Sequence, residues 1–543
     1  MRKARKQPRA KSPTRKAHRS AHPILDVLNS LDAGTVAELR QMMREEMGFG
    51  SEFLDPESVV SLFSEYLAIC ANDDINEDAM DQYLSDLVIE LGELKVSANG
   101  GDRGAREDIQ TILDLLDNAI ESRSISPVDM IMLGKVFGDA GLAVPDSLRK
   151  AVAEGLHEVP TGLEAATEQS LVETLLEMIG QFGDNPFDMH EHVSSLLASL
   201  PPEVGGSVLQ KLVAGRKTMV TQAVSGFLLH PDPVLAQSMA ATLAISAQQA
   251  PVESSLVERL VRMRPWLPRE RQVLLDTPIR AMRLNALPPV KTELPKLIKC
   301  YASVCDGSGT RNLVATLRSG ARYQMATVMM KPAGVVDAMV LPDVPKSVMD
   351  DMVRQMKSSV LMVETDLAGF AAILALALAD GSASGTLPPF KLIEVVESLG
   401  LGPIQPDSAT PREILVKLLA GLPPEQTGPA AVANAHAAPL GSEFRGQWFE
   451  AGEALENLLY PVKGTRQRIA RLMTDYLPLR RAFWARQFAI SALVLRGDGK
   501  TSHPAWKQLA LVGRDIDAGL SLEQIPIMRQ VAEKSVQAFE WNQ

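Results

Sequence analysis

The sequence predicts a mostly α-helical protein: an irregular α-solenoid or helical array with a small antiparallel β-meander insertion and a disordered basic N-terminal tail. Leu, Ala, Val and Met are abundant whereas aromatic residues make up only 5%, a composition that favours helices over strands. Apolar residues recur at helical intervals over most of the chain, and Pro or Gly separates the segments. In one stretch, within residues 296–345, apolar residues instead alternate with other residues, which is typical of strands. The length of 543 residues exceeds that of a typical domain, so several parts are expected.

Residues 1–20 form a basic segment with nine Lys or Arg, no acidic residue and no large apolar residue after Met1. Such a segment cannot bury enough surface to offset its ordering entropy, so it is predicted to be a disordered tail. Its charges would neutralise phosphates and release counterions, which points to nucleic acid. The alternatives are contacts with the acidic body of the protein, a solubility device or a localisation signal. The candidate binding residues of the tail are Arg2, Lys3, Arg5, Lys6, Arg9, Lys11, Arg15, Lys16 and Arg19.

Residues 21–160 are predicted to be an acidic helical region. Within them, residues 52–121 contain 18 Asp or Glu against three Lys or Arg. Leu113, Leu116 and Ile120 show the apolar spacing of a helix. The excess of acid predicts a solvated or partner-facing exterior.

Residues 165–290 are predicted to form helical hairpins. Six candidate helices lie near residues 187–199, 202–214, 218–229, 233–247, 252–264 and 268–284. At the best-defined corner, Asp232 suits the N-cap of the following helix and Pro233 suits its first position. This corner and the next, at 265–268, lie about 35 residues apart, close to the period of helical solenoids. Short antiparallel helices with tight turns have to stack to bury their apolar stripes.

The run from Phe227 to Ala244 has an apolar end of one helix, an Asp-Pro corner and an Ala-rich second helix. In these features it resembles the inter-helix turn and second helix of HEAT-type repeats, over roughly residues 218–250. It departs from that pattern at Leu235 and Ala236, where a basic residue is usual. The resemblance implies a stacked-helix scaffold.

Residues 296–345 are predicted to be a β-meander. Leu313, Ala315 and Leu317 alternate with other residues, and turns at Ser319-Gly320 and at 331–334 separate three strands. Residues 346–420 return to helical spacing. The Pro- and Gly-rich residues 421–441 are predicted to be a linker.

Residues 442–543 are predicted to be a C-terminal basic helical region that opens at Ser442 as N-cap. Residues 463–496 hold eight basic residues and one acid, Asp475. Interleaved aromatic residues suggest a phosphate-contacting groove with stacking rings, although the spacing places Phe483 or Trp484 in the core. The candidate binding residues are Arg466, Arg468, Arg471, Arg480 and Arg481.

Motifs for catalysis or metal binding are near misses, so no catalytic, cofactor or metal residue is assigned. The segment 497–501 ends like a phosphate-binding loop but lacks the first glycine. The acidic turn 74–78 lacks the glycine and the Glu of a calcium loop. His190 and His192 lie two residues apart and are predicted to be surface residues. Cys300 and Cys305 have no partnering pair and are predicted to be buried or idle thiols.

Three cysteines are too few for a disulfide framework, which predicts a reducing, cytoplasmic location. No secretory signal is expected. The longest uncharged apolar run, Leu367 to Ala379, has 13 residues, fewer than the ~18–20 that cross a bilayer, and is predicted to be a buried core helix.

These observations favour a non-enzymatic intracellular scaffold that binds a protein partner through a stacked-helix surface, with the basic tail for electrostatic attachment. The alternative is a nucleic-acid-binding regulator that uses the tail and the C-terminal basic helices, joined by Arg311, Arg318, Arg322 and Lys331 of the meander. We rank an enzyme third, because it would require a polar cluster that forms only in three dimensions.

Overall fold

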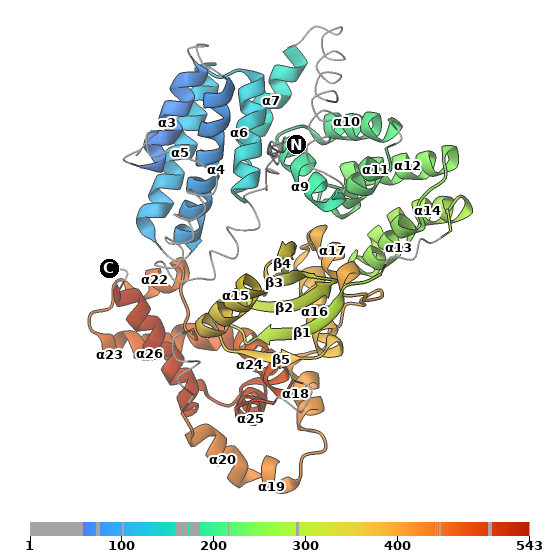
Figure 1. Cartoon of the computed structure of the whole chain (residues 1–543). Coiled ribbons are helices and arrows are strands. Elements are labelled where there is room, and N and C mark those ends of the chain that lie inside the picture. The colour runs from blue at the N-terminus through green and yellow to red at the C-terminus, as the bar shows by residue number, and fades with distance from the viewer. Residues whose placement is uncertain are drawn as a thin grey trace, which may run out of the picture.

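The protein is mostly helical with one inserted antiparallel sheet, as predicted (Figure 1). The computed structural model describes residues 58–71, 77–99, 102–158, 172, 185–215, 217–288, 293–439, 441, 444, 447–497 and 502–541. The predicted basic tail, residues 1–20, lies outside the described residues.

The first helical unit contains α3 (Val59–Cys70), α4 (Glu77–Asn99), α5 (Arg103–Glu121), α6 (Pro127–Asp139) and α7 (Asp146–Glu158). Three of its helices, α3, α5 and α6, start at polar caps, because a side-chain oxygen satisfies amides that have no partner within the helix. Asp102 accepts from the amide of Ala105, and Ser126 and Asp129 form a reciprocal capping box. The α3, α4 and α5 helices pack together, and α6 joins α4 to α7.

The second unit is the helical array, with α9 (Pro186–Leu197), α10 (Pro202–Ala214), α11 (Thr218–Val224), α12 (Pro233–Gln249), α13 (Ser254–Met263) and α14 (Arg269–Leu284). The 3-10 turns η1 (Ser225–Leu229) and η2 (Arg264–Trp266) extend α11 and α13. The six predicted helices therefore exist within a few residues of their predicted bounds. Asp232 caps α12 as expected, since its Oδ1 accepts from the amides of Val234 and Leu235 at 2.7 and 3.3 Å.

The array stacks in two layers. The α10, α12 and α14 helices pack side by side in one layer, and α9 packs against α11 in the other. Leu243 of α12 is completely buried, whereas one helical face of α12 stays exposed. The likeness to HEAT repeats remains a resemblance in sequence.

The sheet has the strand order β4-β3-β2-β1-β5, all antiparallel. Its strands are β1 (Lys296–Ser303), β2 (Arg311–Ser319), β3 (Arg322–Lys331), β4 (Gly334–Val344) and β5 (Met362–Thr365). The predicted meander is confirmed as β2, β3 and β4. The sheet differs from the prediction by two more strands, and β5 lies in the segment 346–420 that was predicted to be helical. Four residues are too few to show a strand period, and β5 forms by pairing with the distant β1.

Helices cover the two faces of the sheet unequally. On one face, α15 (Lys346–Ser359) packs against β3, and Tyr301, Val314, Met325 and Met356 form a small core there. The other face packs on α16 (Leu367–Ser384), α17 (Lys391–Ser398) and α24 (Arg481–Arg496). Among the described residues, α16 alone is long and apolar enough to span a membrane, and half of it is buried. Because it contacts β4, β1 and α24, it has the packing of a core helix, as predicted for Leu367–Ala379.

The C-terminal unit is built around α24 and α25 (Trp506–Asp517). It also contains α22 (Glu453–Leu459), α23 (Thr465–Arg471), the π-turn η3 (Leu472–Tyr476), the 3-10 turns η4 (Leu477–Arg480) and η5 (Leu522–Gln524), and α26 (Pro526–Trp541). Two earlier segments join it, because α18 (Pro411–Leu419) packs on α24 and α25, and α20 (Pro429–Ala437) packs on α25.

The predicted linker, residues 421–441, is therefore not structureless. It contains α19 (Pro424–Thr427) and α20, and a proline occupies the first turn of each. Proline is favoured at a helix start because the amide that it lacks would have had no partner there. The prolines that suggested a linker mark helix starts instead.

Candidate docking surfaces

The C-terminal arginines that the sequence singled out mostly contact their own unit. Arg468 reaches Glu540 at 2.9 Å and the carbonyl of Val462 at 3.0 Å. Arg471 pairs with Asp475 at 2.6 Å. Neither guanidinium is therefore free to neutralise a phosphate without losing a partner.

Arg480 and Arg481 also bind groups within their own unit. Arg480 donates to Glu450 at 3.0 Å and stacks 3.9 Å from the ring centre of Phe483. Glu450 is buried and also accepts from the indole of Trp484 at 2.8 Å. Arg481 donates to two carbonyls near the end of α25. Among the described residues, Arg466 alone of the five candidates has no ion-pair or hydrogen-bond partner, and its side chain is exposed.

The basic residues of the meander do not gather on one face. Arg311 is only 1% exposed and pairs with Asp380 of α16. Arg318 and Arg322 lie at the β2–β3 turn, where Arg322 pairs with Asp343 at 3.0 Å. Lys331 is exposed at the opposite end of β3. The structure does not bring these four cations together.

Arg311 belongs to a polar junction between the sheet, α16 and α24. Asp380 accepts from Nη2 of Arg311 at 3.1 Å and from Nη2 of Arg486 at 2.5 Å. The Nε atoms of both arginines are buried without a hydrogen-bond partner. One carboxylate thus holds two guanidinium groups where three elements meet.

The cysteines and the two histidines that the sequence singled out lie at separate, enclosed positions. Cys300 and Cys305 are buried and free, as predicted, and burial raises the pKa of Cys300 to about 12. His190 and His192, in contrast to the prediction, are half-buried rather than on the surface. Burial lowers their pKa values to about 3 and about 4, so both are neutral. In the part of the chain that the structure describes, no group of three His, Cys, Asp or Glu could hold a metal ion.

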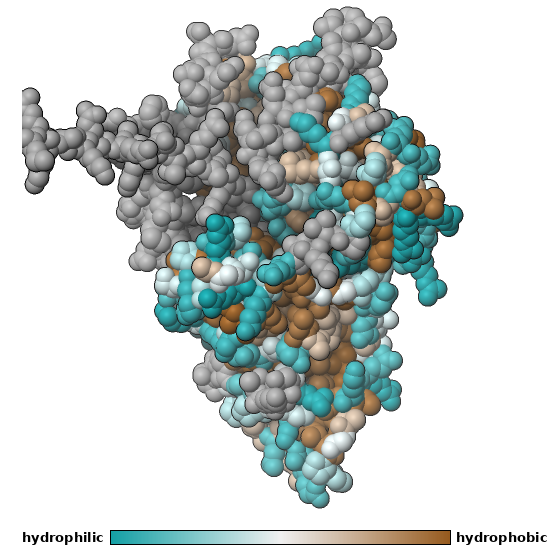
Figure 2. Space-filling model, turned by 45° about the vertical axis from the view of Figure 1, so that its right-hand side comes forward, coloured by the Kyte–Doolittle hydropathy of each residue, from teal (hydrophilic) through white to brown (hydrophobic). Residues whose placement is uncertain are grey.

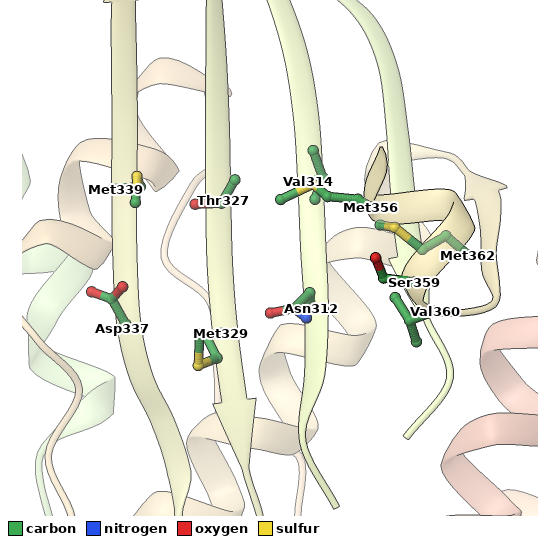
Figure 3. Close-up of a pocket in the computed structure, with 10 residues that line it drawn as sticks. All are labelled: Asn312, Val314, Thr327, Met329, Asp337, Met339, Met356, Ser359, Val360 and Met362. Carbon is green, nitrogen blue, oxygen red and sulfur yellow. The ribbon is translucent and has the colours of Figure 1, made fainter. Parts of the chain in front are cut away.

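A groove lies on the sheet face beside α15 (Figure 3). Its empty volume is about 500 Å³, including solvent at its mouth. Side chains from β2, β3, β4, the end of α15 and β5 line it: Asn312, Val314, Thr327, Met329, Asp337, Met339, Met356, Ser359, Val360 and Met362. Four methionines provide a soft apolar lining, and Asp337 is its one ionisable group.

The edge of the sheet beside this groove is protected against another strand. The Asp337 carboxylate accepts from the amide of Ala338 at 2.8 Å, and irregular pairing interrupts β4 next to Met330. Pro342 removes a further backbone donor. Such devices are how natural sheets prevent edge-to-edge pairing.

The outer layer of the array offers a different kind of surface. The α12 helix contains no charged residue over its 17 positions. Its exposed residues include Val234 at 46% and Ile245 at 56% exposure. The neighbouring α14 exposes Val273 at 60% and Leu284 at 83%. Figure 2 shows brown apolar patches over the array at the upper right, and a longer apolar band below it.

Comparisons with known proteins coincide with these units. Residues 201–285 match the model of the Y4lR second domain, and residues 412–540 match that of the Y4lR C-terminal helical domain. The chain is 22% identical over 452 residues to the uncharacterized protein y4lR of Sinorhizobium fredii (strain NBRC 101917 / NGR234), covering 79% of this chain and 84% of the relative. No solved structure matches the chain. The first match spans the array from α10 to α14, and the second runs from α18 to α26.

Proposed function

We propose that this protein is a non-enzymatic intracellular scaffold that binds a protein partner through the outer layer of the array, α10, α12 and α14. The observation that carries the proposal is the uncharged, partly apolar outer face of α12. The chain as a whole has 22% charged residues, so a 17-residue helix with none is a local departure on an exposed surface. The buried face of α12 explains its leucines and alanines but does not explain the exposed Val234 and Ile245.

The geometry favours a helical partner with an apolar face. The α12 and α14 helices pack side by side, and both expose aliphatic side chains. An amphipathic helix lying across them would make contact every three to four residues. Fully burying an exposed aliphatic side chain contributes about 1.5–3 kcal/mol, and these side chains are already partly buried, so several such contacts together are needed to offset the several kcal/mol lost on association. The three free thiols support a reducing compartment for this binding.

Nucleic-acid binding remains the second candidate because residues 1–20 carry nine positive charges without an acid. The internal pairing of Arg468, Arg471 and Arg480 weakens the case for the folded body. A salt-titrated fluorescence anisotropy assay with short DNA and RNA distinguishes the two sources. Binding that survives deletion of residues 1–20 would place a phosphate-contacting surface in the folded body and contradict the scaffold proposal.

The direct test places a photo-crosslinking amino acid at position 245 and expresses the full chain in the organism that encodes it. We expect one or a few crosslinked proteins, lost when Val234→Glu and Val273→Glu are added. The matched control is Val128→Glu on α6, a residue that is 67% exposed. It should leave the crosslinks unchanged.

Two outcomes would overturn this proposal. Crosslinks that persist in the double variant would show that the outer face does not carry the binding. A product that consists of two copies of this chain, together with a dimer in light scattering that the double variant abolishes, would show a self-association surface instead.

A further inference from the structure

A polar joint connects the start of the array to α17, although about 200 residues separate them in sequence. Lys391 of α17 is buried and reaches Asp188 at 3.1 Å and Glu191 at 2.6 Å, both on α9. Burial disfavours the charge of Lys391, but the two carboxylates outweigh burial and raise its pKa. Lys391 therefore already forms ion pairs with two carboxylates in this joint.

Glu394 lies one helical turn further along α17 in the same joint. Its Oε1 accepts from Nδ2 of Asn185, the N-cap of α9, at 3.2 Å. Burial and then the negative charge of Asp188 raise the pKa of Glu394 to about 7, and Lys391 only partly opposes them. A third carboxylate thus sits beside a cation that two others already share.

The remaining charges near Glu394 are accounted for. Arg259 of α13 pairs with Glu397 of α17 through two bonds of 3.1 and 2.9 Å, and its guanidinium lies 4.5 Å from the ring centre of Phe187. His190 of α9 is neutral and contacts the carbonyl of Ala223. The strands β3 and β4 also contact α17, but their charged residues do not face Glu394. Arg322 pairs with Asp343, Lys331 is exposed, and Asp337 lines the groove on the other face of the sheet.

The other end of the array is attached by contacts that do not involve Glu394. Arg262 of α13 donates to the carbonyl of Leu401 at 3.1 Å. The indole of Trp266 donates to the carbonyl of Ile404 at 3.2 Å. These two contacts do not titrate, because a carbonyl and an indole have no ionisation in the ordinary pH range and arginine keeps its charge there.

We propose that the joint of α9 and α17 is a proton-controlled clamp: protonated Glu394 holds the α9 end of the array against α17, and loss of that proton loosens this end while the α13 end stays attached. This proposal goes beyond the docking function and does not depend on it. The proton lost from Glu394 passes to solvent when the joint opens, and no other reactant is required.

The magnitude follows from proton linkage. The pKa of Glu394 is raised in the closed joint, so its contribution favours closure at low pH and is lost as pH rises through about 7. With an ordinary pKa of 4.5 in the open joint, the opening constant rises about tenfold between pH 6 and pH 8.

The experiment is hydrogen exchange of the full chain, read by mass spectrometry at pH 6 and pH 8 and corrected for the intrinsic pH dependence of exchange. We expect the opening constant for peptides of α9 and α17 to rise about tenfold in the wild type. In Glu394→Gln, which keeps the acceptor for Asn185 and stays neutral, we expect no rise. Peptides of α24 serve as the internal reference.

The matched control is Glu258→Gln, the same chemical change on the exposed side of α13. It should behave as the wild type. An equal rise in Glu394→Gln and wild type would overturn the proposal, as would exchange of α9 and α17 that does not change with pH in the wild type. A rise of the same size in α13 peptides would overturn the idea that only one end opens.

Discussion

Replacing Asp380 by a side chain of nearly the same volume should destabilise the protein strongly. It is the shared acceptor of Arg311 and Arg486, and Arg311 is almost completely buried. Replacing Asp380 by Asn keeps the shape but leaves two cations with no carboxylate, at a place where each already has an unpartnered Nε. Breaking a buried pair by removing one partner costs about 3–5 kcal/mol, because an uncompensated charge stays buried.

The assay is thermal unfolding followed by tryptophan fluorescence. Four of the five tryptophans lie at or after residue 448, so the signal reports mainly on the C-terminal unit that contains Arg486. A unit of this size loses about 2–4 °C of Tm per kcal/mol, so we expect a decrease of about 10 °C for Asp380→Asn. The control is Asp350→Asn, which breaks the exposed pair with Lys346 and should lower the Tm far less, because solvent screens that pair. A decrease in Tm as small as that of the control would refute the reasoning, since it would mean that the two arginines find water or another acceptor.

Three further predictions concern the core, a turn and the thiols. Leu243→Ala removes a completely buried side chain of α12 and should cost about 2–5 kcal/mol in denaturant unfolding; a cost below about 1 kcal/mol would contradict the packing of the array. Gly334→Ala should destabilise the sheet by at least about 2 kcal/mol, because φ is +113° and a Cβ would lie 2.6 Å from Gly381; unchanged Tm would refute this close approach. In thiol titration of the native chain at pH 8, the half-buried Cys70, whose pKa burial raises to about 11, should react slowly and Cys305 not at all; rapid labelling of Cys305 would contradict its burial.

Local signals explain which elements could be predicted from the sequence. The bounds of α10 coincide with the predicted helix 202–214, and α12 starts at the predicted Pro233. A cap, a proline and an apolar stripe act within one turn, so one stretch of sequence contains the whole signal. The strand β5 and its pairing with β1 depend on residues about 60 positions apart, and no local pattern contains that information.

The candidate sites were harder to predict for the same reason. A run of arginines looks the same whether its partners are phosphates or the protein's own acids, and Arg468 finds Glu540 only after folding. Lys391 and Glu394 were missed because charged residues three positions apart on a helix usually form a solvated face. In the structure they are enclosed because α9, distant in sequence, packs over them.

The positions of the charged residues bear both on how the units of the protein pack together and on where we propose that a partner binds. Apolar contacts attract without direction, whereas a hydrogen-bonded ion pair fixes how two elements face each other, and the described units meet at such pairs. Arg106 of α5 reaches Glu456 of α22, Arg311 reaches Asp380, and Lys391 reaches α9. These cations are therefore already engaged within the protein. The outer face of α12 carries no charged residue, which is why we propose it as the docking surface: a partner that bound there would need no ion pair to be broken or desolvated.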